Sequence, residues 1–246
     1  MPDRTRPVLA ALSFLSAVPV GRRVQLGERD LRRGAALFPA VGAGIGALMA
    51  LVAWGSAQIL PAFAAAVIGV ACGVAATAAL HLDGLGDVAD GVGASLSGGD
   101  PAPAMRDPRL GTFGIIAIVL DLLLKTTLMS ALLAVGFPWP VVAAGALARV
   151  TPVALAWRLR YVGGGGGTWM DGIGAGAVVV ASATGLLIAV PSAGVATIGM
   201  FVSMLVAGST IGRWSNRRLG GITGDGFGAA IELAETLALL VAVAVR

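Results

Sequence analysis

Three aspartates stand close together in a chain that carries few charges. Asp83, Asp87 and Asp90 belong to the stretch HLDGLGDVADG, residues 81–91, whereas Asp, Glu, Lys and Arg make up only 12% of the 246 residues. A spacing of i, i+4 and i+7 places the three carboxylates on one face of an α-helix, where they repel one another. Carboxylate oxygens are hard ligands that Mg²⁺, Mn²⁺ and Ca²⁺ prefer. The pattern therefore favours a divalent-cation site over a solvated helix end.

Two arginines and an acid form a second candidate group. The stretch MRDPRLGTFG, residues 105–114, contains Arg106, Asp107 and Arg109 just before an apolar segment. Arginine side chains bind phosphate groups through charge-assisted hydrogen bonds. We therefore expect this stretch to contact an anionic ligand.

A third candidate group begins in a glycine-rich segment near the C-terminus. LGGITGDGFGAAIELAE, residues 219–235, places Asp225 among glycines and continues into an apolar helix that carries Glu232 and Glu235. Free backbone N–H groups at a helix start suit a phosphate group, although this signal alone is weak. Acids inside a membrane helix are functional candidates, because burying a charge there is costly.

The three groups together match the needs of phosphoryl transfer. Such catalysis consists mostly of positioning and of neutralising charge on the transferred phosphorus centre. The chain has no Walker A sequence, which argues against an ATPase. His81 is its only histidine, so a Ser-His-Asp hydrolase is poorly supported, and we interpret His81 as capping or orienting the acidic helix.

The elements that position these groups are membrane helices. The mean hydropathy is +0.90, and no charged side chain occurs between Gly34 and Leu80. Because about 20 apolar residues cross a bilayer as a helix, we predict an all-α, polytopic transmembrane helix bundle rather than a β-barrel. Charges, prolines and glycines divide it into about seven spans, near residues 36–60, 62–81, 112–135, 139–157, 173–190, 194–212 and 229–245.

The connections between these spans alternate in charge. Those near residues 61, 136–140 and 191–193 are uncharged, whereas the others carry arginines. By the positive-inside rule, the arginine-rich connections face the cytoplasm, and all three candidate groups lie on that side. The rule alone accounts for most of the arginines and for the net charge of +4. Nucleic-acid binding has no support, since no basic motif interleaved with aromatic residues is present.

Several smaller features complete the expected bundle. The apolar stretch at residues 8–18 is too short to span comfortably, so we expect a short N-terminal interfacial helix. Asp121 and Lys125, four residues apart in one span, predict an ion pair. Arg149 lies deep in another span and needs an acid from a different helix or a ligand anion. The glycine run at residues 163–167 is interpreted as a flexible linker.

These motifs resemble those of the cobalamin synthase family, the adenosylcobinamide-GDP ribazoletransferases. The resemblance rests on RRGAALFPAVG at 32–42, HLDGLGDVADG, MRDPRLGTFG, LAR at 147–149 and the glycine-rich segment at 219–235, which keep the family's order and spacing. It implies one integral membrane transferase domain over residues 1–246 of a prokaryotic cytoplasmic (inner) membrane protein. The active site would face the cytoplasm. The sequence leaves the oligomeric state open, a homo-oligomer included.

The resemblance also implies a reaction, a cofactor and a set of site residues. The enzyme would use Mg²⁺ to join α-ribazole, or its 5′-phosphate, to adenosylcobinamide-GDP and release GMP. Residues expected to bind metal and carry catalysis are Asp83, Asp87, Asp90, Asp225 and Glu232. Residues expected to bind substrate are Arg33, Arg106, Asp107, Arg109, Arg149, Arg217, Gly221, Thr223 and Gly224.

Two alternatives remain at this point. Residues 87–95, DVADGVGAS, resemble the opening of the CDP-alcohol phosphotransferase motif, but Ser95 replaces its arginine and the later acidic pair is absent at the expected spacing. A phospholipid enzyme of that type is the first alternative. A secondary transporter is the second, although transporters place their acids near the bilayer midplane rather than at the cytoplasmic ends of helices.

Overall fold

The protein folds into helices joined by loops. A computed structural model describes residues 5–19, 24–164 and 167–245, and these residues contain no β-strand beyond one isolated bridge between Tyr161 and Ile222. The α-helices follow in the order α1 (Arg6–Leu15), α2 (Glu28–Ala35), α3 (Phe38–Ser56), α4 (Ala62–Ala76), α5 (Leu80–Leu96), α6 (Pro101–Ala104), α7 (Thr112–Ala134), α8 (Pro140–Ala148), α9 (Val150–Arg158), α10 (Ala175–Ala193), α11 (Ala196–Leu219) and α12 (Gly224–Ala244), with a 3₁₀ helix η2 (Gly167–Gly172) before α10.

The predicted all-α membrane bundle is confirmed. Among the described residues, six helical segments are long and apolar enough to cross a membrane, namely α3, α7, the α8–α9 run, α10, α11 and α12. The count rises to seven if α4 and α5 form one bent span. Each predicted span therefore has its helix, and a short apolar helix, α1, precedes them as expected.

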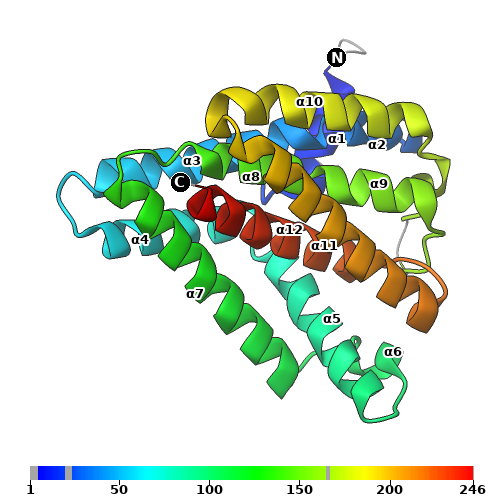
Figure 1. The fold of residues 1–246 in the computed structure, drawn as a ribbon. Helices are drawn as coiled ribbons and strands as arrows, with labels where there is room; N and C mark the ends of the chain where they lie inside the picture. The colour runs from blue at the N-terminus through cyan, green and yellow to red at the C-terminus, as the bar shows by residue number, and fades with distance from the viewer. Residues whose placement is uncertain (1–4, 20–23, 165–166, 246) are drawn as a thin grey trace.

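The connections between spans lie at two opposite ends of the bundle (Figure 1). The α3–α4, α7–α8 and α10–α11 connections and the C-terminus lie at the left in this view. The arginine-rich connections, α9–α10 and α11–α12 among them, lie at the right, with α6 at the lower right. We call this second end the arginine-rich end. This separation agrees with the alternation of charge that the sequence displays.

Small residues let the helices approach closely. A Cβ added to Gly42 of α3 would come within 2.1 Å of the Gly145 carbonyl oxygen in α8. A Cβ added to Gly145 would in turn lie 2.4 Å from the Gly42 oxygen. No larger side chain fits at either position, because backbone meets backbone there. This packing is the kind by which membrane helices associate without a hydrophobic driving force between them.

A sharp break separates α4 from α5. The two helices meet at an angle of 89°, and Ala78 and Ala79 between them have positive φ values of 50° and 59°. Left-handed backbone costs a residue with a Cβ about 1–2 kcal/mol, so the surrounding packing must impose this conformation. The span predicted from the sequence ends near residue 81, where the acidic stretch begins, and the break was not predicted. The break turns α5 so that it packs against α7 and α12 and runs toward α6 at the lower right (Figure 1).

Candidate active site

A cleft opens beside α5 at the point where the connection from α6 to α7 passes it. Its volume is about 440 Å³, and its lining includes Asp83, Asp87, Arg106 and Asp107. Two of the three groups predicted from the sequence, the acidic helix and the arginine stretch, therefore meet on one cavity.

A second hollow of about 210 Å³ adjoins this cleft. Its lining includes Arg106, Arg218, Thr223 and Asp225. Met105 and Arg106 line both cavities, so the third predicted group, the glycine-rich segment, is brought to the same place. We call the two hollows together the acidic cleft.

Close backbone packing brings Asp225 to the acidic helix. A Cβ added to Gly84 of α5 would lie 2.7 Å from the Asp225 carbonyl oxygen, so α5 directly touches the first turn of α12. Asp87 consequently feels the charges of Asp83 and Asp225, and Asp225 feels that of Asp83. Among the described residues, none of these three carboxylates has a Lys, Arg or His partner. They form a locally uncompensated negative group.

Asp90, on the same helix, binds the start of α7. Its Oδ2 accepts a hydrogen bond from the Gly111 N–H at 2.7 Å, and its Oδ1 accepts one from the Gly114 N–H at 2.8 Å. Gly111 and Gly114 are the N-cap and third residues of α7, whose first amides have no partner within their own helix. Asp90 thus caps α7 from a neighbouring helix and fixes the end of the loop that carries Arg106.

Asp107 and Arg109 form a local pair on that loop. The Arg109 guanidinium donates to both Asp107 oxygens, at 3.0 and 2.9 Å, and the Arg109 N–H donates to Oδ1 at 2.9 Å. These hydrogen bonds lower the pKa of Asp107 to about 2. Asp107 lines the acidic cleft, whereas the Arg109 side chain is 87% exposed. Arg109 therefore shapes the loop rather than the cavity.

Backbone pairing holds the glycine-rich segment in place. The Ile222 N–H donates to the Arg160 oxygen at 2.9 Å, and the Val162 N–H donates to the Ile222 oxygen at 2.9 Å. Gly221 is required here, because an added Cβ would lie 2.3 Å from that Arg160 oxygen. Thr223 then caps α12 by accepting a hydrogen bond from the Gly226 N–H at 3.1 Å.

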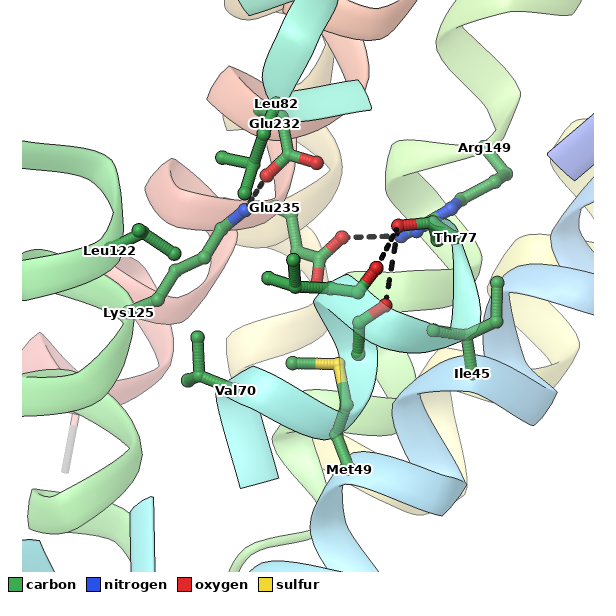
Figure 2. A pocket seen from close by; sticks show the side chains of 12 residues that line it. Ile45, Met49, Val70, Thr77, Leu82, Leu122, Lys125, Arg149, Glu232 and Glu235 are labelled. Atoms are coloured by element: carbon green, nitrogen blue, oxygen red, sulfur yellow. Dashed lines mark hydrogen bonds and ion pairs between the residues drawn. The ribbon is translucent and has the colours of Figure 1, made fainter. Parts of the chain in front are cut away.

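Glu232 lies in a buried polar network, two turns further into α12 than Asp225 (Figure 2). Lys125 of α7 donates to Glu232 and forms an ion pair with Asp121 at 3.0 Å, which confirms the Asp121–Lys125 pair predicted from their spacing. His81 Nδ1 is 3.9 Å from Glu232, and Thr236 donates to Asp121. Glu232 is thus neutralised by Lys125, while Asp83, Asp87 and Asp225 are not.

Arg149 completes the same network. Its side chain is 2% exposed and donates to Glu235 of α12, so the expected acid comes from another helix (Figure 2). Lys125, Arg149, Glu232 and Glu235 line a cavity of about 20 Å³, enough for one water molecule. The structure places Arg149 in this network rather than on the acidic cleft.

The family of the chain follows from comparison with known proteins. A family model described as Cobalamin-5-phosphate synthase matches residues 7–243. The chain belongs to this family of enzymes. No solved structure matches it.

Relatives named adenosylcobinamide-GDP ribazoletransferase match the chain over nearly its whole length. The protein of Shewanella frigidimarina is 32% identical over 243 residues, which cover 96% of this chain and 93% of that protein. The protein of Geotalea daltonii is 34% identical over 249 residues, 98% of each chain. An Escherichia coli protein is 36% identical over 243 residues, 94% of this chain and 96% of its own.

Two other arginines expected to bind substrate lie outside the lining of the acidic cleft. Arg33 is an exposed residue of α2, and Arg217 is an exposed residue near the end of α11. Arg218, the next residue, lines the cleft instead. The sequence marked Arg218 only as one of several arginines at that end, because the face of α11 that meets the cleft depends on tertiary packing.

The acidic cleft fits a magnesium ion only together with a ligand. Among the described residues, no three His, Cys, Asp or Glu side chains lie close enough to hold a metal by themselves. Mg²⁺ in phosphoryl-transfer sites commonly takes one or two carboxylates and fills its octahedral shell with water and substrate phosphates. One or two carboxylates of the group Asp83, Asp87 and Asp225, beside Arg106, fit that pattern.

Proposed function

We propose that this protein is an adenosylcobinamide-GDP ribazoletransferase whose active site is the acidic cleft. It joins α-ribazole, or α-ribazole 5′-phosphate, to adenosylcobinamide-GDP and releases GMP on the cytoplasmic side of a prokaryotic inner membrane. The observation that carries the proposal is the convergence of Asp83, Asp87 and Asp225 with Arg106 on one cleft. Family membership and the names of the relatives support the choice of substrates.

The reaction is an in-line displacement at phosphorus. The ribazole hydroxyl oxygen forms a bond to the phosphorus on the cobinamide side of the diphosphate. The bond between that phosphorus and the bridging oxygen breaks, and the bridging oxygen leaves with GMP. The hydroxyl proton passes to a carboxylate of the cleft and then to solvent. Because little covalent chemistry falls to the protein, positioning and charge neutralisation provide most of the catalysis.

The residues of the cleft divide these tasks by charge. Arg106 and Arg218, which line the second hollow together with Asp225, bind the diphosphate oxygens. Asp83, Asp87 and Asp225 would hold Mg²⁺, which when bound neutralises the diphosphate and the departing GMP. Phosphate oxygens of the substrate would supply the metal ligands that the carboxylates do not.

Two of the predicted catalytic acids receive positioning roles in this proposal. Asp90 holds the first turn of α7 and hence the loop with Arg106. Glu232 binds Lys125 inside the bundle and fixes α12 against α7, which sets the position of Asp225 at the start of α12. Neither residue needs to touch the substrate in order to matter for turnover.

The purified full-length protein in detergent tests the proposal directly. Incubation with adenosylcobinamide-GDP, α-ribazole and Mg²⁺ should release GMP and form the joined corrinoid in a one-to-one ratio. α-Ribazole 5′-phosphate in place of α-ribazole determines which form is accepted. A CDP-alcohol offered as donor should give no CMP. Release of CMP without GMP would contradict the proposal and favour the phospholipid enzyme.

A further inference from the structure

A groove beside α11 is separate from the site described above. It lies between α9, α10 and α11, has a volume of about 540 Å³ and shares no lining residue with the cleft. Its walls are mainly apolar, and their accessible part includes Val178 of α10 and Leu205 of α11, which is 48% exposed. All three helices belong to membrane-spanning segments, so the apolar part of the groove faces acyl chains rather than water.

One end of the groove is polar and positively charged. Arg158 at the end of α9 and Arg213 in α11 line it together with Asn216. Neither arginine has a carboxylate partner among the described residues, whereas Arg32 and Arg109 each pair with an acid at 2.9 Å. Two cations from different helices thus converge at the arginine-rich end of an apolar groove without an anion of the protein to balance them.

The groove contains small and aromatic residues that are typical of a site at the edge of a bilayer. Gly208 lies in its wall, and an added Cβ there would be 3.6 Å from the nearest atom of Thr151, so a Cβ fits in ordinary contact and a larger side chain would extend into the groove. Trp157 lines the same end, and the Arg158 guanidinium lies 5.3 Å from its ring. Tryptophan is enriched at the level of the lipid headgroups, where one side of the ring is apolar and the other is hydrated.

We propose that this groove binds one anionic phospholipid. Arg158 and Arg213 bind the phosphate of the headgroup, and an acyl chain lies along Val178 and Leu205. Basic pockets between membrane helices bind anionic headgroups in this way, because the charge and the apolar wall each match one part of the lipid. A soluble anion would use only the arginines, and a neutral lipid would use only the wall.

Lipid retention measured by native mass spectrometry tests the proposal. The full chain in neutral detergent is mixed with equal amounts of phosphatidylglycerol and phosphatidylcholine of the same acyl chains. We expect retention of one phosphatidylglycerol in preference to phosphatidylcholine. An Arg158→Gln/Arg213→Gln double variant should lower the ratio of retained phosphatidylglycerol to phosphatidylcholine about 25-fold, since one arginine near an anionic surface contributes about fivefold.

A matched control and a second variant separate this site from general surface charge. Arg29→Gln/Arg160→Gln removes two exposed arginines outside the groove and should leave the ratio unchanged. Gly208→Leu keeps both arginines but fills the groove, and it should lower phosphatidylglycerol retention. Excess inorganic phosphate should not displace the lipid.

Four results would overturn the proposal. They are equal retention of both lipids by the unmodified protein, an equal loss in the Arg29→Gln/Arg160→Gln control, full retention by Gly208→Leu, and displacement by inorganic phosphate. The last result would identify a site for a free anion. Each variant is compared only as the monodisperse fraction from size exclusion, so a folding defect does not count as loss of lipid.

Discussion

The carboxylate of Asp90 on α5 holds the N-cap residue of α7, since the Gly111 N–H donates to Asp90 Oδ2 at 2.7 Å. Asp83 and Asp87, on the same helix, line the acidic cleft instead. The three aspartates that share a spacing in the sequence therefore divide into two that line a cavity and one that supports its wall. This division separates metal binding from positioning in a way that mutations can test.

Replacement of Asp90 should destabilise the protein without changing its response to Mg²⁺. In Asp90→Asn, one of the two α7 amides meets an NH₂ group and loses its acceptor. Loss of a helix cap costs about 1 kcal/mol, so Tm should fall by about 3 °C, and turnover should fall with it. The Mg²⁺ concentration for half-maximal activity should stay the same. A higher Mg²⁺ requirement at unchanged Tm would instead make Asp90 a metal ligand.

Arg149 and Glu235 should behave as a structural pair. Arg149→Leu leaves Glu235 buried without its cation, which should cost about 3–5 kcal/mol and lower Tm by about 10 °C. Arg149→Leu/Glu235→Leu removes both charges and should regain most of that loss. Thermal unfolding in detergent measures the stability, and GMP release measures the activity of the double variant. A stable double variant that has lost substrate affinity would restore the substrate-binding role expected for Arg149.

Arg106 and Arg109 should differ in their effect on substrate binding, although both belong to the same stretch. Arg106 lines both hollows of the cleft, and Arg109 is already paired with Asp107. Arg106→Gln should raise KM for adenosylcobinamide-GDP at least about tenfold, the scale of one charge-assisted hydrogen bond to phosphate. Arg109→Gln is the matched control and should change KM less than about threefold. Equal effects would place Arg109 on the substrate as well.

The sidedness of the bundle can be tested by cysteine labelling in whole cells. Cys72, the only cysteine, is first replaced by alanine. Cysteines at Val135 and Val195, both exposed at uncharged connections, should react with a membrane-impermeant reagent. A cysteine at Leu96, exposed at the end of α5, should react only after the membrane is opened. Labelling at Leu96 from outside would place the acidic cleft on the wrong side for a cytoplasmic substrate.

Hydropathy and charge were sufficient to predict the spans, because the bilayer sets both the length and the composition of a membrane helix. They could not predict the break between α4 and α5. Ala78 and Ala79 there adopt left-handed backbone, although alanine is the strongest helix former and gives no sign of a helix end. The conformation comes from packing around these residues, which no local pattern records.

The sequence predicted the separate groups of residues that form the acidic cleft, but it did not predict which of them lie together. The spacing of Asp83 and Asp87 predicted that they share one helix face. The four-residue spacing of Asp121 and Lys125 correctly predicted an ion pair. The approach of Asp225 to Asp83 depends on the contact at Gly84, and the pairing of Glu232 with Lys125 depends on how α7 meets α12. These are tertiary contacts between segments that lie far apart in the chain. The sequence therefore grouped Glu232 with Asp225, whereas in the fold Glu232 pairs with Lys125.

The central claim, that Asp83, Asp87 and Asp225 act as one magnesium site, is tested most directly by a double-mutant cycle on GMP release against Mg²⁺ concentration. Asp87→Asn and Asp225→Asn should each lower turnover at least about 100-fold and raise the Mg²⁺ requirement. Asp87→Asn/Asp225→Asn should lose little more than either single variant, since groups that act as a unit are non-additive. Glu28→Gln, an exposed acid outside the cleft, serves as the control. Losses that multiply to about 10,000-fold, with an unchanged Mg²⁺ requirement in both single variants, would contradict the claim.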